Sequence, residues 1–501
     1  MINYDKIKIT LFHLSSSGSN NYYLYQAASD ELRSKYNIEL LTMEQARMNR
    51  YIDESDVYIT THGEYLSDYD KVNIDLWHGF PLKGMAKMDK QETASDEHIS
   101  QHWAKKDMIM SYSALYNTAM NACNGANISQ YRITGMPRND ALFSVDSHHY
   151  LTKVLPSLSQ HKGETIIFFM PTFRQSIMTP GKIEGGKDFT NFFGLPSLNS
   201  ERLEAFLEEK RIHLVIKLHP FDESYFAQQL GDLHSKRVHV LNDTALKQAQ
   251  LDLYDVLGAA DMLITDYSSV YIDYLLLDRP VLFIPTDLDA YRENRGLLFE
   301  PYELWTPGPK AFTQEELQKY ITNYIVQPDL YRAERNLIRN MCHYYQDNNS
   351  SQRIWNLVDN YIQMHMDVIL KRRKSYKAHK ELQQQIKQRI NLLIEQGHLE
   401  QANTAINQYL ESNSADPDIF AMNGMLHLLI GNPQDAIDSF KNGHKHFPWD
   451  EDLIYNLGYA FESRGNLATA QEYYLKAREM TSKSELIRLL DERIAAISTQ
   501  L

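Results

Sequence analysis

The chain contains 501 residues, of which 43% are hydrophobic, and it carries a formal net charge of -14. This composition allows packed cores in roughly three domains, and the acidic balance disfavours binding to nucleic acid. The two cysteines, Cys123 and Cys342, argue against a disulfide framework or a cysteine zinc site and fit a reducing cytoplasm. No signal-peptide pattern opens the sequence, and no apolar run approaches the ~20 residues of a membrane span. We therefore expect a cytoplasmic protein that is soluble or peripheral on the inner face of the membrane.

Residues 1–155 alternate short apolar runs with helical patterns. The expected strands are Ile7–Phe12, Ile38–Leu41, Val57–Thr60 and Asn73–Trp77. This alternation of strands and helices predicts a mostly parallel sheet with helices on both faces. The block is interpreted as a Rossmann-like domain.

Residues 156–365 repeat the pattern. The expected strands are Thr165–Met170, His213–Leu218, Arg237–Leu241, Met262–Thr265 and Pro280–Ile284. Several are continuous apolar runs, as expected for strands that are covered on both faces. Two such halves in series leave a cleft, and ligands of these folds bind beyond the carboxyl ends of the strands.

A basic segment, residues 366–385, follows the second half. Its cations and histidine are Lys371, Arg372, Arg373, Lys374, Lys377, His379 and Lys380. A run of this kind is typical of a solvated helix face. The alternative is a contact with an anionic membrane surface or an anionic polymer.

Residues 386–501 contain an internal repeat with a period of 34 residues. The equivalent positions are Gly397, Gly431 and Gly465, then Ala402, Ala436 and Ala470, then Ile406, Phe440 and Tyr474. This period, with small residues at the turn between two helical patterns, resembles tetratricopeptide repeats. About three units are near the minimum for a stable stack, so we expect the block to pack on another domain, bind a protein partner or form a homo-oligomer.

Two consecutive hydroxyl side chains follow the strand that ends at Thr265. The sequence there is Asp266-Tyr267-Ser268-Ser269, and a helical pattern starts straight afterwards. Hydroxyls and free N–H groups at a helix start suit an anion such as phosphate. The alternative is that Ser268 or Ser269 only caps the helix. Asp273, one helical turn later, is a further candidate for this site.

Three other strand ends carry candidate site residues. His78 follows a strand and can act as a general base near neutral pH, and Gly79 allows a close backbone approach. Arg174 can hold a phosphate through two hydrogen bonds. His219, before Pro220, can donate to a phosphate oxygen. For each histidine the alternative is a structural role, and for Arg174 it is a surface ion pair.

These sites together describe a pocket for a phosphorylated nucleotide donor and a hydroxyl acceptor. The chain has no Gly-x-Gly-x-x-Gly or Walker A sequence, which argues against a dinucleotide oxidoreductase and a P-loop NTPase. The single Asp-x-Asp near the cleft, Asp287-Leu288-Asp289, is read as a loop cap rather than as a metal ligand pair. We expect no obligatory metal or other cofactor, and Mg²⁺ on the diphosphate is the alternative.

Five stretches resemble the CDP-glycerol:poly(glycerophosphate) glycerophosphotransferases, which make teichoic acids. They are residues 77–83 (Trp-His-Gly-Phe-Pro-Leu-Lys), 134–140 (Thr-Gly-Met-Pro-Arg-Asn-Asp), 171–174 (Pro-Thr-Phe-Arg), 218–220 (Leu-His-Pro) and 264–269 (Ile-Thr-Asp-Tyr-Ser-Ser). The resemblance covers about residues 10–345. Phe80 departs from it, because the family commonly has Thr there, and the repeat block is not part of the usual catalytic core.

The resemblance implies a GT-B-like pair of Rossmann-type domains, with the acceptor on the first half and the CDP-linked donor on the second. It implies that His78 is the base and that Arg174, His219, Ser268 and Ser269 contact the donor phosphates. We group His219 with His78 as catalytic, and Thr172 and Asp266 with the donor-binding residues. Gly79, Lys83, Arg138 and Asp273 are expected to support the site.

The expected reaction moves glycerol 3-phosphate from CDP-glycerol to a hydroxyl of a growing teichoic-acid-like or capsular polymer and releases CMP. Alternatives are transfer of ribitol phosphate from CDP-ribitol, or glycosyl transfer from a nucleotide sugar in the same fold. A non-enzymatic alternative is a scaffold whose repeats bind a partner. Intact catalytic-type residues at nearly every matching site argue against the scaffold.

Overall fold

The chain forms two compact units in the computed structural model. One comprises residues 1–43, 54–65 and 71–365, and the other comprises residues 44–53, 66–70 and 366–501. The structure describes residues 6–13, 17–42, 45, 54–63, 70–161, 163–172, 185, 191–219, 222–223, 226, 236–412, 416–481 and 483–500. Among these residues, no helix combines the length and the apolarity that a bilayer span requires.

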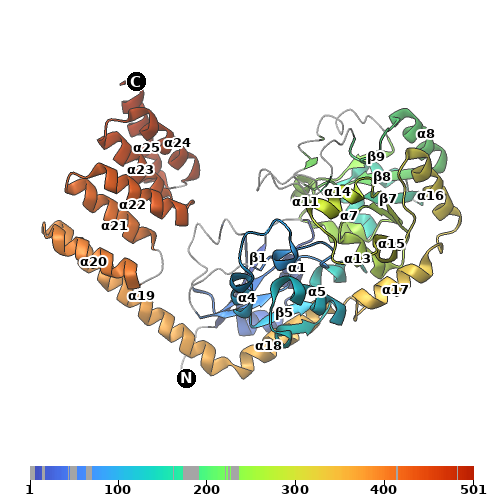
Figure 1. The fold of residues 1–501 in the computed structure, drawn as a ribbon, viewed down its shortest axis with the longest axis horizontal. Helices are drawn as coiled ribbons and strands as arrows, with labels where there is room; N and C mark the ends of the chain where they lie inside the picture. The colour runs from blue at the N-terminus through green and yellow to red at the C-terminus, as the bar shows by residue number, and fades with distance from the viewer. Residues whose placement is uncertain are drawn as a thin grey trace. The chain divides into compact units, whose positions relative to one another are not determined.

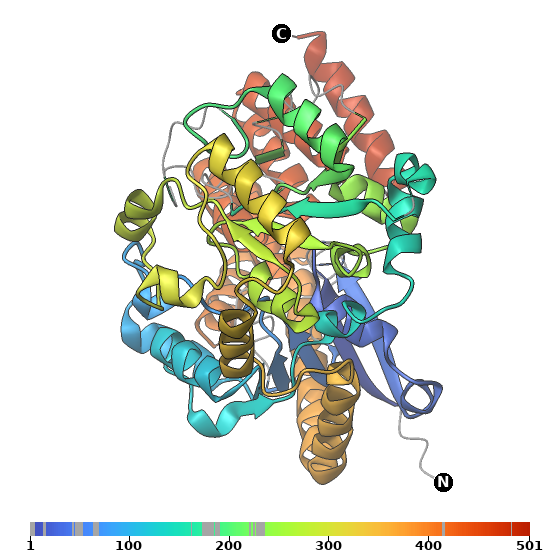
Figure 2. The same ribbon diagram turned by 90° about the vertical axis from the view of Figure 1, so that its right-hand side faces the viewer.

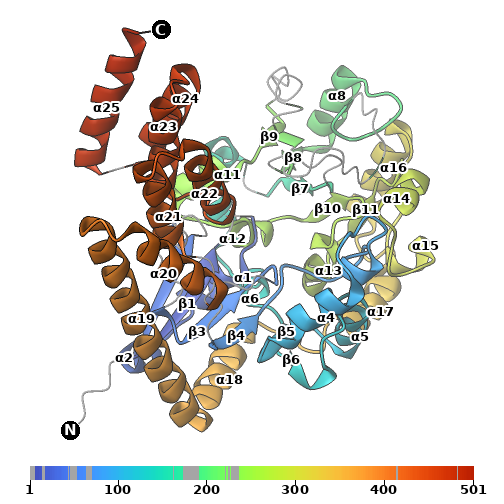
Figure 3. The same cartoon turned by 60° about the vertical axis from the view of Figure 1, so that its left-hand side comes forward.

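The first half of the larger unit is a parallel sheet with the strand order β2-β1-β3-β4-β5-β6 (Figure 3). Its strands are β1 (Ile7–His13), β2 (Tyr36–Thr42), β3 (Val57–Thr60), β4 (Val72–Asp75), β5 (Met108–Ser111) and β6 (Tyr131–Ile133). Its helices are α1 (Asn20–Gln26), α2 (Asp30–Lys35), α4 (Asp96–Ala104), α5 (Ala114–Asn124), α6 (Pro137–Ala141) and α7 (Ser147–Val154), with 3₁₀ turns η2 (Ala86–Met88), η3 (Ile128–Gln130) and η4 (Pro156–Gln160). The sequence patterns did not reveal β5 and β6, because β5 contains a single β-branched residue, Ile109, and Arg132 interrupts the apolar run of β6.

The second half is a parallel sheet with the order β11-β10-β7-β8-β9. Its strands are β7 (Thr165–Phe169), β8 (Ile212–Ile216), β9 (Val238–Val240), β10 (Met262–Thr265) and β11 (Val281–Phe283). Its helices are α8 (Ser200–Lys210), α11 (Asp243–Ala249), α12 (Leu253–Leu257), α13 (Val270–Tyr274), α14 (Leu288–Asn294), α15 (Tyr302–Trp305), α16 (Gln314–Val326) and α17 (Arg332–Cys342), with η5 (Leu275–Leu277). All five expected strands are present, so the predicted pair of parallel α/β halves is confirmed.

Helices cover both faces of the second sheet (Figure 2). On one face, α8 and α16 place Leu207 and Ile321 in a cluster with Ile216 of β8. On the other face, a large cluster combines Val215 and Leu263 with residues of the first half. The two halves therefore share one continuous hydrophobic core, which holds the two sheets together.

The chain returns to the first half through α18 (Ser350–Met364) (Figure 1). Trp355 Nε1 donates to the Leu24 carbonyl at 2.8 Å, and Arg353 Nε donates to the Thr134 carbonyl at 2.8 Å. Residues 350–364, which the sequence analysis grouped with the second half, thus pack on the first half.

The regular elements in the described part of the smaller unit are all helices. Its helices are α19 (Met366–Glu395), α20 (Leu399–Ser412), α21 (Pro417–Leu429), α22 (Pro433–His446), α23 (Glu451–Ser463), α24 (Leu467–Met480) and α25 (Ser484–Ser498). The expected basic segment, residues 366–385, is the first part of α19. Arg372 pairs there with Asp70 at 2.8 Å.

The 34-residue period corresponds to pairs of helices. The repeated glycines Gly397, Gly431 and Gly465 have φ of 74°, 82° and 81°, which only glycine adopts without strain. The equivalent Ala402, Ala436 and Ala470 are fully buried. A Cβ on Gly424 would lie 2.3 Å from the Phe440 ring, so the small residue is needed for the helices to approach. The predicted tetratricopeptide-like stack is therefore present.

Candidate functional site

The loop that carries His78 is held by a buried carboxylate. β4 ends at Asp75, two residues earlier than expected, and the Asp75 side chain is fully buried. It accepts hydrogen bonds from the Trp77 N–H at 2.8 Å, the Gly63 N–H at 2.9 Å and the Thr60 hydroxyl at 2.8 Å. These donors lie at or just after the ends of β3 and β4. Asp75 therefore holds together the loops that follow these two neighbouring strands.

The His78 ring is oriented by one hydrogen bond and one stacking contact. Its Nδ1 lies 3.2 Å from the Thr61 carbonyl oxygen, which can only accept a hydrogen bond. In the neutral ring Nδ1 therefore carries the proton, and Nε2 keeps its lone pair. The ring stacks on His62 with centroids 4.1 Å apart and an angle of 11° between the planes. Part of the residue is open to solvent, while the ring packs against its neighbours.

The surroundings of His78 favour its neutral form. Desolvation by the surrounding protein and the charge of His62 lower the pKa of His78 well below its usual value of 6.5. Positive charge on Arg138 and Lys83 acts in the same direction, and the bond to Thr61 opposes it. His78 is thus unprotonated at neutral pH, as a general base must be.

His62 was not identified by the sequence analysis. It follows β3 in the sequence Thr60-Thr61-His62-Gly63, and its ring Nδ1 lies 2.9 Å from the Thr61 hydroxyl. Its position immediately after the predicted strand Val57–Thr60 was an available signal, because β3 and β4 are neighbours and their ends meet at one edge.

The Ser268–Ser269 turn lies next to the His78 loop. A Cβ placed on Gly79 would lie only 2.8 Å from Ser269 Oγ, so glycine permits this approach. Ser269 occupies the N-cap position of α13, but its side chain makes no capping hydrogen bond. Ser268 and Ser269 are both partly exposed. The reading of Ser269 as a plain helix cap is therefore wrong, although α13 spans five residues and contributes little dipole.

Asp266 holds the two strand-end turns of the second half together. Its carboxylate accepts the Thr172 N–H at 2.8 Å and the Tyr267 N–H at 2.5 Å, and it is 2% exposed. Thr172 follows β7 and is also buried. These contacts position the turns that face the first half. Contact of Asp266 and Thr172 with the donor stays a prediction.

Arg138 and Asp273 form a buried ion pair between the two halves. Arg138 Nη2 lies 2.6 Å from Asp273 Oδ2. Arg138 Nη1 also donates to the His78 carbonyl at 2.7 Å and to the Gly18 carbonyl at 3.1 Å. The Tyr254 hydroxyl donates to Asp273 at 2.6 Å. Arg138 thereby ties the His78 loop to α13, the helix that follows the serine turn.

Fewer contacts are described for the other predicted site residues, Arg174, His219 and Lys83. Arg174 lies outside the described residues. His219 follows β8 at the same sheet edge as Thr172 and is half-buried, and its carbonyl accepts the Asp222 N–H at 2.9 Å. Lys83 is partly buried and forms an isolated bridge with Leu297 of the second half. The donor-binding roles of Arg174 and His219 stay predictions.

The departure from the family pattern at Phe80 lies in the core. Phe80 is 3% exposed and contacts Tyr112, Tyr116 and Phe299, with ring centroids 5.7 to 5.8 Å away. Its side chain fills space between aromatic rings rather than facing an acceptor. We conclude that Phe80 stabilises the His78 loop by packing in the core.

Asp287 and Asp289 have different partners in the structure. Asp287 accepts the Tyr267 hydroxyl at 2.9 Å at the N-cap position of α14. Asp289 is 95% exposed and pairs with Arg292. In the described part of the chain, the one group of three clustered metal-ligand side chains lies elsewhere, near the start of β7.

Comparison with known proteins gives the same family as the sequence motifs. The profile of the CDP-Glycerol:Poly(glycerophosphate) glycerophosphotransferase family matches residues 9–360. A teichoic acid poly(glycerol phosphate) polymerase of Bacillus spizizenii is 25% identical over 320 residues, which cover 58% of this chain and 76% of that protein. The Teichoic acid ribitol-phosphate polymerase TarL of Staphylococcus aureus is 28% identical over 226 residues, covering 44% and 35%. This chain thus spans about a third of TarL.

A curated primase and a solved polymerase structure are also similar to this chain. A teichoic acid glycerol-phosphate primase of Bacillus subtilis is 27% identical over 299 residues, covering 58% of this chain and 68% of that one. The structure of the wall teichoic acid polymerase TagF superposes with a TM-score of 0.57 at 19% identity, over 72% of this chain and 90% of that one. This superposition confirms the GT-B-like fold. With the matched profile covering both α/β halves, the chain belongs to the CDP-glycerol:poly(glycerophosphate) glycerophosphotransferase family.

Proposed function

We propose that this protein transfers sn-glycerol 3-phosphate from CDP-glycerol to a hydroxyl group of a growing polyol-phosphate or glycan chain and releases CMP. The family and the glycerol-phosphate relatives support this reaction. The observation that carries the proposal is the approach of the His78–Gly79 loop to Ser269 of the other half. A base and a hydroxyl-bearing turn are thereby brought to the same point.

The proposed reaction starts at His78. Its Nε2 accepts the proton of the acceptor hydroxyl, and the oxygen forms a bond to the phosphorus that carries glycerol. The bond between that phosphorus and the bridging oxygen breaks, and the bridging oxygen leaves with CMP. Ser268, Ser269, His219 and Arg174 are proposed to stabilise the negative charge that develops on the diphosphate.

Transfer of ribitol phosphate is the second candidate, because TarL is named for that activity and matches part of this chain. A variant of TagF has been solved after a soak with CDPG, at a TM-score of 0.56 to this chain. That soak favours a CDP-linked polyol as the class of donor to test first. The two polyols differ only beyond the phosphate, so the proposed base and phosphate contacts are the same for both.

A donor screen tests the proposed function. The full chain is incubated with an acceptor and with CDP-glycerol, CDP-ribitol or a nucleotide sugar, each with EDTA and with Mg²⁺. Of the three donors, we expect only CDP-glycerol to release CMP, both with EDTA and with Mg²⁺. Mass spectrometry should then show products that grow by glycerol-phosphate units. Growth by ribitol-phosphate units instead selects the second candidate. Turnover of only a nucleotide sugar overturns both.

The pH dependence of kcat tests the state of His78. Its lowered pKa means that the base is neutral at pH 7 and becomes protonated only as the pH falls below 6.5. We expect the acid limb of the profile to lie below pH 6.5. His62→Ala removes both a shielding ring and a neighbouring charge, so this limb should move to higher pH.

The matched control for that measurement is His98→Ala, because His98 is exposed on α4 and is not one of the main groups that shift the pKa of His78. Its profile should coincide with that of the wild type. An acid limb that stays in place in His62→Ala would contradict the proposed coupling between the two stacked rings.

A further inference from the structure

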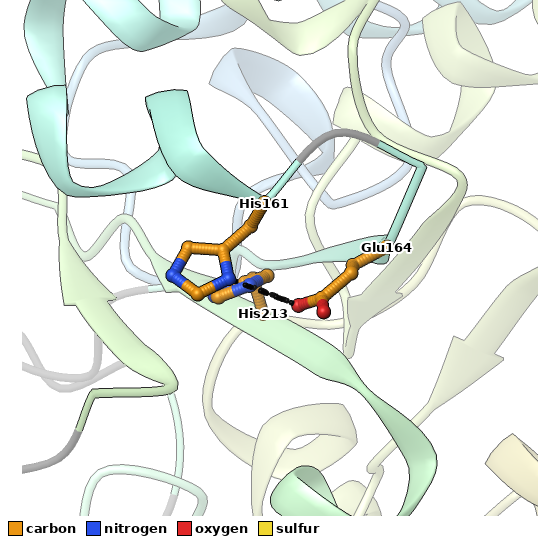
Figure 4. Close-up of side chains that lie close together, drawn as sticks. All are labelled: His161, Glu164 and His213. Carbon is orange, nitrogen blue, oxygen red and sulfur yellow. Dashed lines mark hydrogen bonds and ion pairs between the residues drawn. The ribbon is translucent and has the colours of Figure 1, made fainter.

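Three metal-ligand side chains converge near the amino ends of β7 and β8 (Figure 4). His161 follows η4, Glu164 precedes β7, and His213 lies in β8. Glu164 Oε2 is 3.3 Å from His161 Nδ1 and 2.8 Å from His213 Nε2. All three ligand atoms lie within 4.8 Å of one another. A tetrahedral zinc ion with bonds of about 2.0–2.2 Å needs ligand atoms about 3.3–3.5 Å apart, so small movements complete the geometry.

The second ring nitrogen of His213 already has the kind of partner that metal-bound histidines use. His213 Nδ1 lies 3.0 Å from His239 Nε2, and His239 Nδ1 lies 3.1 Å from Ser157 Oγ. If each Nδ1 donates along this series, His213 Nε2 is left with a lone pair directed at the cluster. Such outer hydrogen bonds orient a metal-binding imidazole and fix its tautomer.

Without a metal, His213 and Arg237 can share the Glu164 carboxylate. His213 Nε2 lies 2.8 Å from Glu164 Oε2, which only accepts, and 3.0 Å from Arg237 Nη1, which only donates. A protonated Nε2 and Arg237 Nη1 can both donate to Glu164, since Nη1 also contacts that carboxylate. A metal ion bound to Nε2 would take the place of this proton.

Two arginines lie next to the cluster, and their charges affect how tightly it can bind a metal ion. Arg237 is held by Glu208 through Nε at 2.6 Å and Nη2 at 3.2 Å, and its Nη1 contacts Glu164. Arg211 Nη2 lies 3.1 Å from Glu164 Oε1. Both arginines can still donate hydrogen bonds to the carboxylate when it binds a metal, because carboxylates that bind metals are generally hydrogen-bonded as well. Their positive charge weakens the site relative to one without them.

We propose that His161 Nδ1, Glu164 Oε2 and His213 Nε2 bind a Zn²⁺ ion, with water as the fourth ligand. Two imidazoles and one carboxylate suit this borderline metal, whereas Mg²⁺ prefers oxygen ligands. The His161 side chain is 34% exposed and gives the ion access, while His213 is 1% exposed. The site joins the end of η4 to β7 and β8. It lies at the opposite end of β8 from His219, which is six residues further along the chain, or roughly 20 Å at the rise of an extended chain, so we assign the site a structural role.

Zinc binding by the full chain tests this site. Protein stripped with EDTA is titrated with Zn²⁺ by calorimetry, and Tm is measured with and without the metal. We expect the wild type to bind one equivalent and to gain Tm. His161→Ala, which removes a partly exposed ring, should lower the affinity at least tenfold and abolish the Tm gain. Glu164→Gln keeps the side-chain volume and should have the same effect.

The matched control is His148→Ala, because His148 is exposed on α7 and outside the cluster. It should bind zinc like the wild type. Replacing Zn²⁺ by Co²⁺ should give the visible absorption of a tetrahedral site in the wild type and not in His161→Ala. Circular dichroism verifies that each variant is folded. The proposal is overturned if the wild type binds no zinc, or if folded His161→Ala binds it equally, since the other histidines would then account for the metal.

Discussion

His78→Ala is expected to lower kcat for CMP release by about 10²–10⁴-fold, which is the usual effect of removing a well-placed general base. The ring is held by Thr61 and His62, and its pKa lies well below 6.5, so it is neutral under assay conditions. Because its Nε2 is proposed to act in the transition state, the Michaelis constant for CDP-glycerol should change much less than kcat. Steady-state kinetics with CDP-glycerol and a fixed acceptor give both constants.

His98→Ala serves as the control for this measurement, and its kcat should equal that of the wild type. His219→Ala gives a useful contrast, because its proposed contact is with the donor. It should raise the donor Michaelis constant as well as lower kcat. Near wild-type CMP release by His78→Ala would remove the assigned role of the base, while an unchanged donor constant and kcat in His219→Ala would reject only the donor contact.

Arg138→Met is expected to lower the free energy of unfolding by about 3–5 kcal/mol, because it leaves Asp273 buried without its cation. Met retains most of the side-chain volume, so the loss reports the charge rather than a cavity. The change also removes the donor that holds the His78 carbonyl, so the remaining folded enzyme should have a reduced kcat. Urea unfolding and steady-state kinetics measure the two effects separately.

The double variant Arg138→Met with Asp273→Leu separates the two consequences. Replacing both members of a buried ion pair by apolar residues is often close to neutral, so most of the lost stability should return. The kcat should stay low, because the His78 loop still lacks its arginine. Arg202→Ala is the control, since its pair with Glu315 is exposed and should matter little. Equal unfolding free energies for Arg138→Met and the wild type would contradict the proposed importance of the pair.

The strand ends were predictable because their signals are local. His78, His219 and Ser268 each follow an apolar run that ends in a turn, and parallel strands bring such ends to one edge. The repeat was equally readable, since Gly397 and Gly431 mark the same turn 34 residues apart. β5 and β6 were missed because β5 has only one β-branched residue, Ile109, and Arg132 interrupts β6.

The partners of these residues were not predictable from the sequence. The stacking of His62 on His78 depends on β3 lying beside β4, which is a property of the strand order rather than of either segment. Arg138 was expected to support the site, but its bond to Asp273, 135 residues later, depends on how the two halves pack. The position of Phe80 in the core likewise required the rings of Tyr112 and Tyr116 around it.

Local patterns along the chain were enough to predict two parallel α/β halves, a helical repeat unit, and the strand ends proposed to form the phosphotransferase site. Periodicity, turn residues and motif spacing are carried by neighbours along the chain, so they can be read without coordinates. Which of these residues contact one another depends on the three-dimensional fold. The Gly79–Ser269 approach, the Arg138–Asp273 pair and the His161–Glu164–His213 cluster join segments far apart in sequence. Such contacts arise from strand order and domain packing, which no local pattern encodes.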